Sequence, residues 1–113
     1  MAPPHFELRF TPRADAELAH LEKTPNLAKR LKAVQSGLGK LQANTRHQGL
    51  HTHKFESLSG PNGEEVFTAY AQNETPGAYR VFFRYGPNVT AGEGKKKKVV
   101  THVLTIVAIT PHP

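Results

Sequence analysis

Apolar and polar residues follow a helical period in two stretches near the start of the chain. Before them, His5–Phe10 alternates between polar and apolar residues and predicts a half-buried strand. Thr11 followed by Pro12, and Thr24 followed by Pro25, are two helix start signals, since each places a capping hydroxyl before a proline at the first helical position. The second helix carries an apolar stripe on one face: Leu27, Leu31, Val34, Leu38 and Leu41. We expect an αα-hairpin whose second helix frays before Asn44, because Gly37 and Gly39 weaken its last turns.

The pattern becomes extended after Asn44. Lys54–Leu58, Glu64–Gln72 and Ala78–Tyr85 are three predicted strands, separated by the turn sequences SGPNG and NETPG. After a predicted loop, GPNVTAGEGKKKK, the segment Val99–Thr110 is β-branched and almost continuously apolar, which is typical of a strand buried on both faces near the sheet centre. The sequence thus predicts one α+β domain over residues 1–113, in the order β-α-α-β-β-β-β. Its single, mostly antiparallel sheet has the helical hairpin on one face.

Ala78–Tyr85 places two arginines inside an apolar and aromatic run. In an extended chain its apolar odd-numbered residues share one face, and Arg80, Phe82 and Arg84 share the other. The apolar face should meet the helices, which leaves the cation–ring–cation face uncovered. Such a face suits RNA, with the charges on phosphates and the ring against a base. Two alternatives stay open: Arg84 forms an ion pair with Glu56, Glu64 or Glu65, or Phe82 contacts a protein partner.

Composition favours an acidic partner. Fifteen Lys and Arg against nine Asp and Glu give a formal net charge of +6, and Lys95, Lys96, Lys97 and Lys98 form a basic run. This run either grips RNA or ribosomal phosphates, or is a solvated tip that discourages edge aggregation. The absence of cysteine excludes disulfides, thiolate metal sites and thiol nucleophiles. The segment MAPPHFELRF lacks a basic stretch followed by an apolar one, so we expect a soluble, cytoplasmic protein with no membrane contact.

Three histidines, His47, His51 and His53, lie in one polar segment. The last two would share a face of an extended chain, as metal ligands can. With no cysteine and no carboxylate in the same run, we interpret them as polar loop residues and expect neither a metal site nor a cofactor.

Five segments in this order resemble the RelE/ParE superfamily, the toxin components of bacterial type II toxin-antitoxin pairs. They are LRFTPRADAEL, LAKRLKAV, KFESLSG, AYRVFFRY and LTIVAITPHP, and together they span nearly the whole chain. The resemblance implies a RelE/ParE-like fold and, for the mRNA-cleaving branch, a site at Lys54, Arg80 and His112 on a concave sheet face. It also implies a small acidic antitoxin, and mRNA, bound at the ribosome, as substrate. The gyrase-inhibiting branch shares the fold without the cleavage site.

Metal-free RNA cleavage activates a 2′-OH to attack the adjacent phosphate, and it requires a base, a proton donor and cations. His112 or Glu56 could serve as base or acid, and Arg80, Arg84 and Lys54 as cations. Simpler interpretations remain for three of these residues: Lys54 is solvated or pairs with Glu56, and His112 belongs to a mobile tail. The favoured hypothesis is an mRNA endoribonuclease toxin. The alternatives are a non-catalytic member that inhibits gyrase or only binds its antitoxin, and a basic RNA-binding module.

Overall fold

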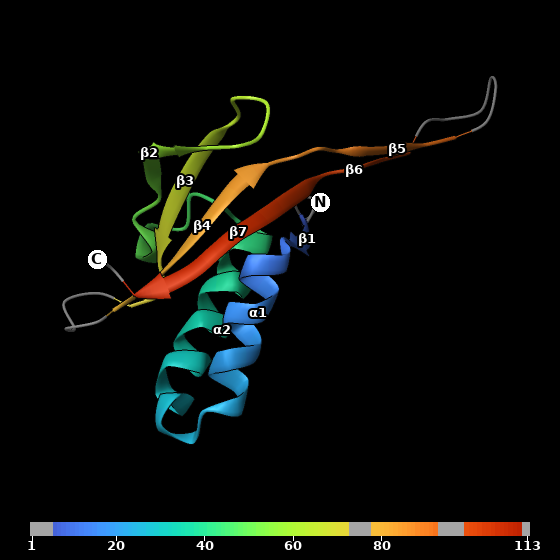
Figure 1. The fold of residues 1–113 in the computed structure, drawn as a ribbon. Coiled ribbons are helices and arrows are strands. Elements are labelled where there is room, and N and C mark those ends of the chain that lie inside the picture. Colours follow the sequence, from blue (N-terminus) through green and yellow to red (C-terminus); the bar gives the residue numbers. More distant parts are fainter. Residues whose placement is uncertain (1–5, 73–77, 93–98, 112–113) are drawn as a thin grey trace.

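The computed structural model describes residues 6–72, 78–92 and 99–111. A five-stranded sheet forms one layer and two helices form the other, against one face of the sheet (Figure 1). The strand order is β1-β7-β4-β3-β2, where β1 is Glu7–Phe10, β2 His53–Ser59, β3 Glu65–Tyr70, β4 Tyr79–Tyr85 and β7 Val103–Pro111. β1 runs parallel to β7 and the other pairs are antiparallel. The predicted fold class, a mostly antiparallel α+β sheet with a helical hairpin on one face, is confirmed.

The hairpin begins as its start signals predict. Helix α1 spans Pro12–Lys23, and the Thr11 hydroxyl accepts a hydrogen bond from the Ala14 N–H at 3.1 Å. The second signal gives a 3₁₀ turn, η1 at Pro25–Leu27, before α2 at Ala28–Ala43. The expected fraying of α2 is wrong, because the helix continues to Ala43 and buries Gly37 beside Ala71. Tertiary contact thus outweighs the low helix propensity of glycine.

The hydrophobic core lies between the helices and the sheet. α1 packs on β7 and α2 on β4. Three β4 side chains are buried in this core, Tyr79, Val81 and Phe83, as their odd positions predict. β1 pairs with β7 only as far as Ile106, and beyond it the Glu17 carboxylate accepts the Ile109 N–H at 2.9 Å. Helix α1 therefore covers the part of the β7 edge that β1 leaves open.

Part of the predicted loop between β4 and β7 is a strand, so the loop prediction is wrong for Val89–Ala91. β5, Val89–Ala91, pairs antiparallel with β6, Val99–Thr101, and the two strands extend away from the sheet (Figure 1). Both strands are rich in β-branched residues, which favour extended backbone. His102 separates β6 from β7, so the predicted strand Val99–Thr110 is two strands. Within the described ranges, no helix is both long and apolar enough to cross a membrane.

Candidate functional site

The sheet face opposite α1 and α2, here called the uncovered face, carries three β4 side chains: Arg80, Phe82 and Arg84. Their shared orientation follows from strand alternation and agrees with the burial of the odd-numbered residues on the helix side. In the sheet register Arg80 lies opposite Tyr70 of β3, and His53 of β2 lies opposite Thr68. Tyr70 and His53 therefore belong to the uncovered face as well. The prediction that the two arginines lie on the face that the helices leave free is confirmed.

Arg80 is held against an aromatic ring. Its guanidinium carbon lies 3.5 Å from the centroid of the Tyr70 ring, a cation–π contact between neighbouring strands. The Arg80 Nε is buried and has no hydrogen-bond partner among the described residues. A buried guanidinium N–H normally has a hydrogen-bond partner, so Arg80 is a candidate for contacting a bound anion.

Two histidines flank the same tyrosine. The ring centroids of His51 and His53 lie 5.4 and 5.8 Å from that of Tyr70. The His53 Nδ1 is 2.9 Å from the His51 carbonyl oxygen, and since a carbonyl can only accept, Nδ1 carries the proton. The Nε2 atom of His53 is then the ring nitrogen with a lone pair. We call Arg80, Tyr70, His51 and His53 the Tyr70 cluster.

The backbone at His51 is strained. Its φ of 48° lies in the left-handed region, which costs a residue with a β-carbon about 1–2 kcal/mol. The conformation lets the chain leave the 3₁₀ turn η2, Gln48–Leu50, and enter β2 with both histidine rings beside Tyr70. Such strain is found preferentially at functional sites.

Arg84 forms an ion pair. Its Nη1 lies 2.8 Å from a Glu64 carboxylate oxygen, and the other carboxylate oxygen accepts the Asn62 N–H at 2.7 Å. Hydrogen bonds from the backbone N–H groups of Glu64 and Asn62, together with the nearby Arg84 guanidinium, lower the pKa of Glu64. The ion-pair alternative is therefore confirmed for Arg84, and its role in RNA binding stays a prediction.

The expectation that Phe82 is exposed is wrong. Its side chain is 6% exposed and packs edge-to-face on Phe55, with 4.9 Å between the ring centroids. Val66 and Ala108 complete this small cluster on the uncovered face. The cover comes from β2, because the Phe55 side chain reaches across β3 to contact Phe82. A ring so enclosed offers little area to a base.

Lys54 is not beside Arg80, so its expected place is wrong. In the register Lys54 lies opposite Phe67, whose ring stacks on Phe83 of the core, so Lys54 belongs to the helix-side face. Its Nζ lies 3.5 Å from the Glu65 carboxylate, so Lys54 pairs with Glu65 and not with Glu56, the partner considered above. Glu56 is exposed, in the stretch of β2 where the register with β3 shifts. The remaining candidates, His112 and the run Lys95–Lys98, lie outside the described residues.

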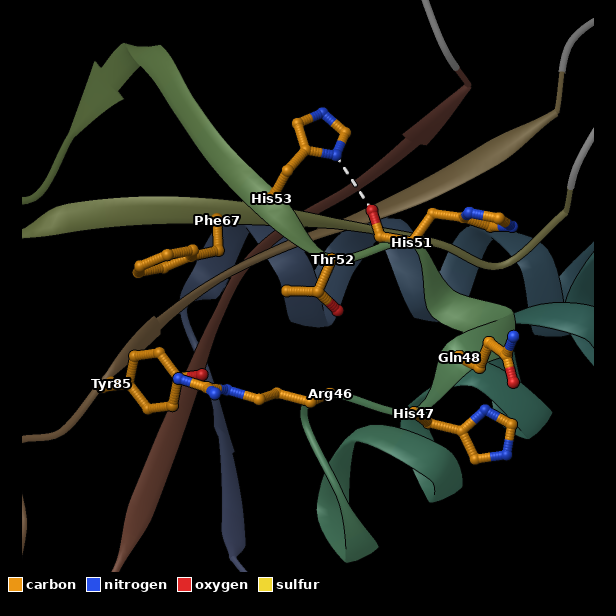
Figure 2. Close-up of a pocket in the computed structure, with 8 residues that line it drawn as sticks. All are labelled: Arg46, His47, Gln48, His51, Thr52, His53, Phe67 and Tyr85. Carbon is orange, nitrogen blue, oxygen red and sulfur yellow. Dashed lines mark hydrogen bonds between the residues drawn. The ribbon is translucent and has the colours of Figure 1, made fainter.

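A pocket of about 550 Å³ opens on the helix side of the sheet, next to the loop that follows α2. Eight described residues line it: Arg46, His47, Gln48, His51, Thr52, His53, Phe67 and Tyr85 (Figure 2). Phe67 and Tyr85 are in edge-to-face contact, 5.3 Å between centroids, and the Tyr85 hydroxyl is hydrogen-bonded to Thr45 at 3.0 Å. In Figure 2 the His53 ring points away from these aromatic rings, toward the uncovered face. His51 and His53 thus border both this pocket and the Tyr70 cluster.

The sequence interpretation missed Tyr70 and treated the histidines as polar loop residues. A signal for Tyr70 was present, because strand alternation places it on the face of Val66 and Thr68. His51 and His53 come close to Tyr70 because of the 3₁₀ turn at Gln48–Leu50, a turn that was not predicted from the sequence. Among the described residues, no group of three His, Cys, Asp or Glu side chains could hold a metal ion.

Comparison with known proteins shows a likeness of fold. No protein-family model matches the chain, and no curated protein matches its sequence. Among solved structures it is similar to the YoeB dimer from Staphylococcus aureus, with a TM-score of 0.60 and 12% sequence identity over 96% of this chain and 99% of that one. At that identity the likeness shows the fold alone: this chain has a YoeB-like fold over nearly its whole length.

Proposed function

We propose that the chain is the toxin of a type II toxin-antitoxin pair and that it cleaves mRNA through the Tyr70 cluster. The observation that carries the proposal is the position of Arg80, stacked on Tyr70 beside two histidines on the face that the helices leave free. The YoeB-like fold supports it, together with the resemblance of the sequence to the RelE/ParE toxin superfamily. The formal charge of +6 suits a nucleic-acid substrate in the cytoplasm, and we expect the ribosome to present it.

In the proposed reaction His53 takes the proton of a ribose 2′-OH at its Nε2 atom. The 2′ oxygen attacks the adjacent phosphorus, and the bond to the 5′ oxygen of the next nucleotide breaks. Arg80 stabilises the negative charge that develops on the phosphoryl oxygens. Protonated His51 gives its proton to the leaving 5′ oxygen, so the products are a 2′,3′-cyclic phosphate and a 5′-OH. Imidazole suits both transfers because its protonation changes near neutral pH.

The test is primer extension on a transcript in a translating extract to which the purified chain is added. Arg80→Ala should lower the cleavage rate about 100-fold or more, as the loss of a donor to a developing oxyanion does. His53→Ala should lower it by about 100-fold to 10,000-fold, the range for a general base. Arg9→Ala is the matched control, because Arg9 is an exposed arginine of edge strand β1, paired with Glu7. Full activity in folded Arg80→Ala would refute the proposed site. Translation arrest without RNA cleavage would instead favour a binding-only protein.

We further propose that an acidic antitoxin segment binds the uncovered face. A groove of about 320 Å³ there is lined by Arg13, Phe55, Leu58 and Phe82, among others, and Leu58 is 37% exposed. It offers an amphipathic acidic segment apolar contact beside positive charge. A small acidic protein encoded by a neighbouring gene should co-purify with the chain. Leu58→Asp and Arg84→Glu should weaken the complex more than Lys23→Glu, which changes one exposed charge at the end of α1. Equal binding by all three variants would contradict this surface.

A further inference from the structure

The helix-side pocket bordered by the loop after α2 shares His51 and His53 with the reaction proposed above, but its aromatic wall and Arg46 have no role in that reaction. Its aromatic part is rigid, because Phe67 stacks on the buried Phe83 and Tyr85 is anchored to Thr45. Tyr85 nevertheless remains 45% exposed. An exposed aromatic ring held on two sides is a surface on which a planar ligand can stack at little entropic cost.

The polar part of the pocket includes two hydrogen-bond donors, Arg46 and His47. Arg46 is exposed and extends from the loop toward Tyr85 in Figure 2. Within the described part of the chain, its guanidinium has no carboxylate at ion-pair distance. The His47 Nδ1 accepts the Gly49 N–H at 3.1 Å, so Nε2 carries the ring proton and is a donor. None of the eight described lining residues is acidic.

We infer that this pocket binds one nucleotide, with the base against Tyr85 and Phe67 and the phosphate at Arg46. A planar ring and an adjacent anion are the two features that the lining complements, and about 550 Å³ lies within the range of roughly 300–1,000 Å³ for small-ligand sites. An acidic peptide would use the donors but not the exposed aromatic wall. That the nucleotide belongs to a single-stranded RNA rests on the proposed function, because residues 51–53 connect the pocket to the Tyr70 cluster.

The test is an NMR titration of the isotope-labelled full chain with 5′-mononucleotides, a nucleoside, inorganic phosphate and a glutamate-rich peptide. Mononucleotides should shift the amide signals of Arg46, Thr52 and Tyr85 and bind more tightly than the nucleoside or phosphate alone. A short single-stranded RNA should compete for the same signals. Tyr85→Leu and Arg46→Ala should each raise the dissociation constant about tenfold, from loss of stacking or of one charge-assisted hydrogen bond. Tyr85→Phe keeps the ring and should bind within about twofold of the wild type.

Arg9→Ala is the control and should leave mononucleotide binding unchanged, since Arg9 lies on edge strand β1, paired with Glu7, and does not line this pocket. Because binding is read without cleavage, failure here is distinguishable from failure of the proposed reaction. Peptide binding without nucleotide binding, or nucleotide shifts that Tyr85→Leu leaves intact, would overturn the inference. Mononucleotide binding that RNA does not displace would overturn the assignment to an RNA strand.

Discussion

Replacing Phe82 tests whether the centre of the uncovered face is a packed cluster around a buried ring or a solvent-exposed ring. Phe82 is 6% exposed and contacts Phe55, Val66 and Ala108. Truncation of a buried phenylalanine to alanine costs about 3–5 kcal/mol of unfolding free energy. This cluster is small and lies on a face that no helix covers, so water can partly refill the space. We therefore expect the lower end, about 3 kcal/mol, for Phe82→Ala.

The measurement is urea and thermal unfolding monitored by circular dichroism. Small domains have unfolding free energies of about 5–15 kcal/mol, so a decrease of this size should lower the melting temperature by roughly 10 °C. Phe82→Leu retains most of the volume and is the matched control, with an expected cost below about 1.5 kcal/mol. Combining Phe82→Ala with Phe55→Ala should reveal a coupling of about 0.5–1.5 kcal/mol from the ring pair.

A decrease below about 1 kcal/mol for Phe82→Ala would refute this reasoning, because a buried ring costs more than that to remove. The ring would then be largely solvated, as the alternation of β4 alone suggested, and free to meet RNA or an antitoxin. A full decrease with no coupling to Phe55 would place the ring against other neighbours.

Three further predictions concern stability and charge. Gly39→Ala should raise the unfolding free energy by about 0.5–1 kcal/mol, because Gly39 lies in α2 and the new methyl group meets no atom within 4 Å. Gly63→Ala should instead lower the unfolding free energy, because Gly63 has a φ of 80°, which alanine rarely adopts. Glu64 has a lowered pKa in the folded protein, so its contribution to the free energy of unfolding is present above the reference value of 4.5 and is lost as the pH falls through the folded value. In urea unfolding, the wild type should therefore be more stable than Glu64→Gln, and this difference should shrink only below about pH 4.5. Replacing Lys95–Lys98 by serine should flatten the salt dependence of RNA binding by about one slope unit for each phosphate that is no longer neutralised, and coincident binding curves would reduce the run to a solubility device.

The fold was predictable from sequence because its signals are local. Thr11 with Pro12 fixes the start of α1, and the alternation of β4 separates the buried Val81 and Phe83 from Arg80 and Arg84. Errors arose where distant residues decide the outcome. The contact of Gly37 with Ala71 keeps α2 helical to its end, and pairing with β6 converts a predicted loop into β5. The β-branched residues of β5 favour extended backbone, but the pairing partner of β5 and the contact of Gly37 with Ala71 cannot be identified from either segment alone.

The candidate site was only half predictable for the same reason. Alternation places Arg80 on the correct face, but Lys54 depends on the register between β2 and β3, which a single residue of shift would invert. The observed register places His53 on the uncovered face and Lys54 on the helix-side face. A functional role carried over from a family by position along the chain is therefore less secure than one carried over by a residue's cross-strand partner.

The edge position of β2 connects the two proposed sites. The Tyr70 cluster lies on the uncovered face and the pocket inferred to bind a nucleotide lies on the helix side, yet His51 and His53 contribute to both. β2 is the last strand of the sheet order, so no further strand of that sheet, as far as the structure describes it, stands between the two faces at that edge. Thr52, between the two histidines, donates its hydroxyl to the Thr45 carbonyl at 2.7 Å, and Thr45 in turn holds Tyr85. A single-stranded RNA bent around this edge could place one nucleotide on Tyr85 and a phosphate at Arg80, whereas a stiff duplex could not follow the turn. We therefore propose single-stranded RNA as the substrate, with the strained turn at His51 positioning both histidines.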